Sequence, residues 1–117
     1  MITVAETATF QSKINKLLSK EEKDELIAYL SEHPSAGDLI QGTGGIRKLR
    51  WAKADKGKSG GVRVIYYFHS DMMPLYLLAV FAKNEKANIT AEERNILSKA
   101  VKELVTYWRR KNGQGIH

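Results

Sequence analysis

The residues of this sequence with the clearest capacity for chemistry are basic, and they are concentrated in residues 47–63. Asp55 is the single acidic residue in this stretch, against seven positive charges, so the stretch carries a net charge of +6. That value equals the net charge of the whole 117-residue chain. A positive field of this density attracts polyanions, of which RNA and DNA are the commonest. The basic residues are Arg47, Lys48, Arg50, Lys53, Lys56, Lys58 and Arg63.

The pattern of the surrounding residues predicts that three cations meet at one end of a β-sheet. Residues 46–51, 62–69 and 75–82 have the alternation or the β-branched, aromatic and apolar content of strands. If consecutive strands pair as hairpins, the two connecting turns lie at opposite ends of the middle strand. The first strand then ends, the second begins and the third ends at the sheet end beside residues 53–61. Each of these strand ends carries one cation. These cations are Arg50, Arg63 and Lys83.

Such a cluster is suited to cleavage of a phosphodiester bond in RNA. The 2′-hydroxyl attacks the neighbouring phosphate, and fixed cations stabilise the charge that builds on the phosphoryl oxygens. Arg63 can grip a phosphate through two parallel hydrogen bonds, and Lys83 or Lys48 is a candidate proton donor. Tyr66 or Tyr67, whichever faces the groove that would bind RNA, could stack on a base.

Ordinary structural interpretations compete with each of these roles. A cation at a strand end is more often solvated than catalytic, and a lysine-rich run such as residues 53–58 is usually a solvated loop. The aromatic run at residues 66–68 is more typical of a sheet core than of a base-stacking surface. Glu85 is the one carboxylate beside the basic residues, where a salt bridge is a commoner role than general-base catalysis.

Several other kinds of site are excluded or disfavoured. The chain has no cysteine, which rules out disulfides, thiolate catalysis and cysteine-type zinc sites. The three histidines, His33, His69 and His117, lack metal-type partner spacing, so we predict no metal and no cofactor. The Gly-Thr-Gly-Gly run at residues 42–45 lacks the Gly-Lys-Ser/Thr ending of a phosphate-binding loop, and no helix is predicted to start there.

The N-terminal third of the chain predicts a short strand and two helices that cover one side of the sheet. Residues 2–5 form a short apolar segment, and residues 10–18 repeat apolar side chains at helical spacing. Ser19 and Glu22 have the spacing of a capping box that begins the second helix. This helix should end near His33, because the residue before a proline disfavours the helical region.

The remaining elements are a glycine-rich loop at residues 35–45, the three strands and a last helix. Thr90 and Glu93 repeat the capping-box spacing at the start of this helix. The helix is predicted to end near Lys111, with Gly113 and Gly115 closing it off. Its buried face is expected to comprise Ile96, Leu97, Ala100, Val101, Leu104 and Trp108.

These elements predict one α+β domain over residues 1–117, with a small antiparallel sheet packed against an N-terminal helix pair and with a C-terminal helix. The longest apolar run, residues 72–82, is interrupted by Pro74 and is far shorter than the about 20 residues of a membrane-spanning helix. The first ten residues lack the basic start and apolar core of a signal peptide. We therefore expect a soluble, cytoplasmic protein that has no contact with a membrane.

Two blocks within residues 38–104 resemble a known family. IQGTGGIRKLRWAKADKGKSGGVRVIYYF, which ends at Phe68, and YLLAVFAKNEKANITAEE, which ends at Glu93, are similar to the HigB-type branch of the RelE/ParE toxin superfamily. The resemblance implies a RelE-like fold and a toxin of a bacterial type II toxin–antitoxin module. It also implies a ribosome-dependent mRNA endonuclease that a cognate antitoxin keeps inactive. For the HigB type, that antitoxin is HigA-like and carries a helix-turn-helix domain, so that operator DNA is bound only through the antitoxin.

Position by position, the resemblance implies that Arg63 contacts the scissile phosphate. The catalytic residues that it implies are Arg63, Lys83, Lys48 and Arg50. The residues expected to bind RNA are Arg47, Lys53, Lys56, Lys58, Tyr67 and Asn84. Asn84 stands where the RelE pattern has a second arginine, and residues 85–90 contain no counterpart of the family's catalytic tyrosine. The sequence therefore does not identify a general base.

Two other functions remain open at this point. ParE-like members of the superfamily share the fold but inhibit DNA gyrase by binding it, without cleaving RNA. The dense basic cluster argues against gyrase inhibition, because a protein-binding inhibitor does not need it. The other alternative is a basic binding module without catalysis, which predicts retention of RNA without a cleaved product.

Overall fold

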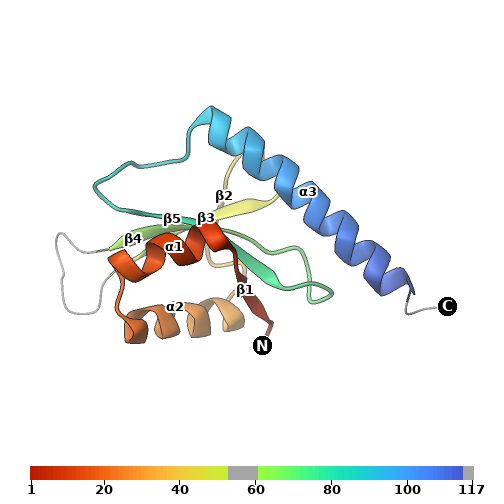
Figure 1. The fold of residues 1–117 in the computed structure, drawn as a ribbon, viewed down its shortest axis with the longest axis horizontal. Coiled ribbons are helices and arrows are strands. Elements are labelled where there is room, and N and C mark those ends of the chain that lie inside the picture. Colours follow the sequence, from red (N-terminus) through yellow and green to blue (C-terminus); the bar gives the residue numbers. More distant parts are fainter. Residues whose placement is uncertain (53–60, 115–117) are drawn as a thin grey trace.

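The described residues, 1–52 and 61–114, of the computed structural model form three helices and five strands. In chain order they are β1 (Val4–Glu6), α1 (Ala8–Leu17), α2 (Lys20–Glu32), β2 (Asp38–Leu39), β3 (Ile46–Trp51), β4 (Val62–Tyr67), β5 (Leu75–Ala82) and α3 (Ala91–Gln114). The strands form one sheet in the order β1-β5-β4-β3-β2. Helices α1 and α2 pack on one face of this sheet and α3 packs on the other (Figure 1). This arrangement confirms the α+β architecture that the sequence predicts.

The helix pair α1–α2 is fixed at its ends by side-chain caps. At the start of α1 the Thr7 hydroxyl accepts a hydrogen bond from the Phe10 amide at 3.3 Å. At the start of α2, Ser19 and Glu22 form the predicted capping box, with bonds of 3.1 and 2.8 Å. The core between the helix pair and the sheet comprises Phe10, Ile14, Leu18, Leu26, Leu30, Val62, Val64, Tyr66, Leu75, Leu77 and Val80.

The middle of the sheet consists of two hairpins, as predicted. Strand β4 pairs antiparallel with β3 on one side and with β5 on the other. Strand β5 is buried on both faces, in agreement with its nearly continuous apolar run. Strand β4 ends at Tyr67 rather than at the predicted His69, because its ladder with β5 stops at the pair Tyr67–Tyr76. The two connecting segments therefore lie at opposite ends of β4, which is the premise of the predicted cation cluster.

The strands at the two edges of the sheet differ from the prediction. Strand β1 covers residues 4–6 rather than 2–5, and it pairs parallel with β5, so the sheet is mixed rather than wholly antiparallel. The Thr7 amide and hydroxyl both donate to the Leu77 carbonyl, which holds the start of α1 against β5. Strand β2 lies inside the predicted loop 35–45 and pairs antiparallel with β3. Strands this short lack the four to eight alternating residues that make a strand visible in a sequence.

A glycine-rich turn joins β2 to β3. The buried Thr43 hydroxyl donates to the Ile40 carbonyl at 2.6 Å and accepts from the Ile46 amide at 3.1 Å. The backbone around Thr43 takes positive φ values of 79°, 76° and 121°, which glycine adopts at little steric cost. The residues with these values are Gly42, Gly44 and Gly45. The turn thus sets the register in which β3 enters the sheet.

Helix α3 begins with the second predicted capping box. The Thr90 amide donates to Glu93 at 2.7 Å, and the Glu93 amide donates to the Thr90 hydroxyl at 3.1 Å. Ile96 is 62% exposed, so its predicted place on the buried face of the helix is wrong. The core beneath α3 comprises Ile40, Ile46, Ile65, Tyr67, Met73, Leu78, Phe81, Ile89 and Val101. Leu97, Leu104, Val105 and Trp108 of α3 pack against it.

The C-terminal end of α3 lies beyond its predicted end near Lys111. The helix continues through Gly113 because its last turns are held from outside. The Asn112 side chain donates to the Met72 carbonyl at 2.9 Å, and a single glycine inside a helix costs only about 1 kcal/mol. No helix within the described ranges is long and apolar enough to span a membrane.

Candidate active site

The register of the sheet places two arginines and a phenylalanine in one row. Arg50 lies directly opposite Arg63, and Arg63 lies directly opposite Phe81 of β5. Residues that face each other across neighbouring strands project to the same side, with Cβ atoms roughly 4.5–5.5 Å apart. Phe81 belongs to the core beneath α3. Both arginines therefore project to the α3 side of the sheet.

Arg50, Arg63 and Lys83, called the basic cluster from here on, border a hollow of about 220 Å³ at the end of the sheet. Lys83 is held there through its backbone, because its amide donates to the Gly61 carbonyl at 3.2 Å, just before β4. The lining of the hollow is Arg50, Trp51, Ala52, Gly61, Val62, Arg63 and Lys83. The structure thus brings together the three cations that strand order predicted. Their catalytic roles stay a prediction.

Arg63 carries an unsatisfied hydrogen-bond donor. Within residues 1–52 and 61–114, its buried Nε has no hydrogen-bond partner. The other buried side-chain atom in this condition, Oε1 of Glu6, has the Lys23 ammonium 3.1 Å away. A buried donor without an acceptor costs about 1–3 kcal/mol, and such groups are uncommon in native proteins. The Arg63 guanidinium also lines the hollow, where it is suited to bind an anion.

The other two basic residues of β3 do not line the hollow. Lys48 is two residues from Arg50 and shares its side of the sheet, and its ammonium donates to the Ala87 carbonyl at 3.2 Å. Arg47 projects to the opposite side, where it donates to the Gly37 carbonyl at 2.7 Å. Lys48 is therefore a neighbour of the basic cluster, whereas Arg47 holds the loop that precedes β2.

The tyrosines of β4 are core residues. Tyr67 is 4% exposed beneath α3, and Tyr66 is fully buried on the helix-pair side. Burial raises the pKa of both phenols. The Tyr66 hydroxyl donates to the Pro34 carbonyl and accepts from the Gly37 amide, each at 2.8 Å. The base-stacking role expected for Tyr67 is at odds with this burial, because no ring face is left open for a base.

The remaining predicted RNA-binding residues fall into two groups. Asn84 is exposed and follows Lys83 in the turn after β5. Three lysines lie outside the described residues, namely Lys53, Lys56 and Lys58. In the described part of the chain, no group of three or more His, Cys, Asp or Glu side chains could hold a metal ion.

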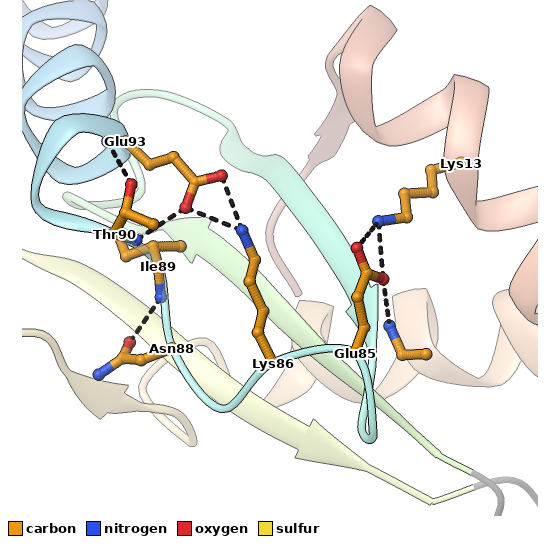
Figure 2. A network of polar contacts seen from close by, with 8 residues as sticks. Lys13, Glu85, Lys86, Asn88, Ile89, Thr90 and Glu93 are labelled. Atoms are coloured by element: carbon orange, nitrogen blue, oxygen red, sulfur yellow. Dashed lines mark hydrogen bonds and ion pairs between the residues drawn. The ribbon is translucent and has the colours of Figure 1, made fainter.

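Beyond Lys83, the segment that joins β5 to α3 carries a network of polar contacts (Figure 2). Within it, each Glu85 carboxylate oxygen accepts a hydrogen bond of 2.9 Å from the Lys13 ammonium of α1. This bond lowers the pKa of Glu85, with help from the Ala82 amide. Glu85 is therefore ionised at neutral pH and paired, which confirms the salt-bridge role. No local pattern in the sequence marks Lys13 as its partner, since the two are 72 residues apart.

Lys86 is a further cation near the cluster that sequence reasoning missed. Its ammonium lies 5.1 Å from the centre of the Phe81 ring and 2.7 Å from a Glu93 carboxylate oxygen. Phe81 is the cross-strand neighbour of Arg63, but both carboxylate oxygens of Glu93 bind Lys86 and neutralise its charge there. The available signal was its position three residues after Lys83 in the same connecting segment.

The arrangement is suited to hold a phosphate group. The planar guanidinium groups of Arg50 and Arg63 can each bind phosphate oxygens through paired hydrogen bonds. Lys83 supplies a compact charge from a third element of the fold. Cations fixed in a hollow stabilise developing negative charge without having to reorganise during a reaction.

Two comparisons relate the chain to known proteins. A family model described as "RelE toxin of RelE / RelB toxin-antitoxin system" matches residues 4–113. Among solved structures, the chain is similar to a double arginine-to-alanine mutant of the E. coli toxin RelE in the free state. That match has a TM-score of 0.54 and 19% sequence identity, and it covers 88% of this chain and 97% of the other. At this identity the structural likeness establishes the fold.

Proposed function

The chain belongs to the RelE family of toxins of toxin–antitoxin systems, and from this premise we propose that it is a ribosome-dependent mRNA endonuclease of the HigB type. One observation carries the proposal: Arg50, Arg63 and Lys83 border a single hollow, and the buried Nε of Arg63 lacks an acceptor in the described part of the chain. A scissile phosphate bound in the hollow would be held by the guanidinium of Arg63. The two HigB-like sequence blocks support the assignment to this branch.

In the proposed reaction, the 2′-hydroxyl of one nucleotide attacks the adjacent phosphorus. A 2′,3′-cyclic phosphate forms as the 2′-hydroxyl proton passes to solvent water, the bond to the 5′-oxygen of the next nucleotide breaks, and that oxygen takes up a proton as it leaves. Arg63 and Arg50 would stabilise the charge on the non-bridging oxygens, and loss of one such donor commonly costs roughly 10²–10³-fold in rate. Lys83 or Lys48 would donate the proton to the leaving oxygen.

The proposed partners follow from the same premise. The toxin would act in the cytoplasm on mRNA bound to the ribosome. Lys48 shares the side of the basic cluster and Asn84 follows Lys83, so both are expected to contact RNA next to the scissile phosphate. A cognate HigA-like antitoxin with a helix-turn-helix domain would keep the toxin inactive and would provide its only link to operator DNA.

Brief expression in bacteria, followed by mapping of new mRNA 5′ ends, tests the proposal. Arg63→Ala is compared with Arg110→Ala, which removes an exposed arginine of α3. New ends within translated regions are expected for the unaltered protein and for Arg110→Ala, and they should be missing for Arg63→Ala. Continued mRNA cleavage by Arg63→Ala would contradict the proposal. Growth arrest without new ends would instead favour gyrase inhibition.

A further inference from the structure

The turn that leaves β5 presents its two central residues to the basic cluster. Its ends are Ala82 and Glu85, joined by a hydrogen bond of 3.0 Å from the Glu85 amide to the Ala82 carbonyl. The residues between them are Lys83 and Asn84. The Lys83 amide is also tied to the Gly61 carbonyl at 3.2 Å. The position of Lys83 at the hollow therefore depends on how firmly this turn is held.

The Glu85 side chain binds both the backbone of the turn and a lysine of helix α1. One carboxylate oxygen accepts from the Ala82 amide at 3.3 Å, so that the side chain closes back on the start of the turn. The same carboxylate binds Lys13 of α1 at 2.9 Å (Figure 2). The turn is thereby anchored to a helix that packs on one face of the sheet. Both side chains are 40–45% exposed, and ion pairs this exposed contribute little to stability. Stability alone thus gives little reason for the contact.

We infer that Glu85 is a positioning residue for RNA cleavage, which with Lys13 fixes the turn that carries Lys83. This inference rests on the proposed function. A cation stabilises a transition state in full only when it is held in place beforehand. Neither Glu85 nor Lys13 lines the hollow, so neither is placed to contact the scissile phosphate, and we expect both to act through Lys83.

A direct role of Lys13 in RNA binding makes the opposite prediction. If Lys13 bound RNA itself, removal of Glu85 would free its ammonium and remove a negative charge, and both RNA binding and cleavage would become stronger. If Glu85 positions Lys83, removal of Glu85 slows cleavage. The affinity for RNA stays equal or becomes tighter, because a negative charge is lost. The two effects of one substitution therefore separate the two roles.

The test measures single-turnover cleavage of ribosome-bound mRNA and affinity for the same ribosomes. Glu85→Ala and Lys13→Met should each lower the cleavage rate on the order of tenfold, less than the ~10²-fold that a 1 Å misplacement can cost. Lys13→Arg preserves the ion pair and should cleave normally. Asp24→Ala breaks the matched exposed ion pair of α2, which also has a 2.9 Å contact, and should have no effect.

Hydrogen exchange gives a readout that does not depend on cleavage. The amides of Lys83 and Glu85 should exchange faster in Glu85→Ala and Lys13→Met than in the unaltered protein, with an unchanged unfolding midpoint. Unchanged exchange, or normal or faster cleavage in these variants while Arg63→Ala is inactive, overturns the inference alone. Normal cleavage by Arg63→Ala overturns the proposed function and this inference with it.

Discussion

Replacing Arg63 by methionine is expected to stabilise the fold while it removes the proposed activity. In the described residues the buried Nε of Arg63 has no partner, and Arg50 lies directly across the strand pair. Methionine keeps an unbranched apolar stem beside Phe81, the neighbour on β5, but has neither a donor nor a charge. A residue that is retained for function at a cost in stability should behave in this way.

Two contributions set the magnitude of this effect. Removing the unsatisfied donor contributes about 1–3 kcal/mol, and the lower half of that range applies because Arg63 as a whole is only half-buried. Removing the repulsion from Arg50 contributes about 0.2–1 kcal/mol. The free energy of unfolding should therefore rise by about 1–3 kcal/mol, which corresponds to roughly 4–12 °C in Tm.

Urea unfolding followed by circular dichroism measures this change. The control is Arg110→Met on the exposed side of α3, which should stay within about 0.5 kcal/mol of the unaltered protein. A loss of more than about 1 kcal/mol in Arg63→Met would refute the reasoning, because it would show that Arg63 stabilises the sheet.

Three further predictions concern residues that hold the site in place. Tyr66→Phe should lower the free energy of unfolding by about 2–3 kcal/mol, because the Pro34 carbonyl and the Gly37 amide lose their 2.8 Å partner; a change within about 0.5 kcal/mol in urea unfolding would contradict it. Burial raises the pKa of Tyr66 above its ordinary 10.0, so its contribution to stability is complete below pH 10 and is lost as the pH rises through the folded-state pKa. Stability measured against pH should accordingly fall less steeply above pH 10 in Tyr66→Phe, and equal slopes would count against this. Gly61→Ala should cost about 1–3 kcal/mol, because φ is +122° and the new Cβ would lie 3.2 Å from the Trp51 carbonyl oxygen; an unchanged Tm would show that the strain is absent.

The parts of the fold that sequence reasoning predicted correctly are those with local signals. The capping boxes at Ser19 and Thr90 have a fixed spacing, and both are present. The hairpins on either side of β4 follow from strands that are close in sequence. Once these hairpins pair, the meeting of Arg50, Arg63 and Lys83 follows from geometry, and the structure shows it.

The features that could not be predicted depend on partners distant in the sequence. Strand β1 has three residues, and its parallel pairing with β5 joins Val4 to Leu75. The ion pair between Lys13 and Glu85 spans 72 positions. Tyr67 lies in an aromatic run whose composition is more typical of a core than of a base-stacking surface, but composition does not show which rings are covered. Only the packing of α3 over the sheet decides that its ring is buried.

Cleavage of mRNA by 2′-hydroxyl attack at the basic cluster is tested most directly with purified toxin and ribosomes programmed with a short mRNA. A second mRNA carries a 2′-deoxynucleotide at the cleaved position, and Arg63→Ala is assayed alongside. Fragments ending in a 2′,3′-cyclic phosphate and beginning with a 5′-hydroxyl are predicted for the unmodified mRNA. No cleavage is predicted for the deoxy-substituted mRNA or with Arg63→Ala. Cleavage of the deoxy-substituted mRNA, or full activity of Arg63→Ala, would contradict this mechanism.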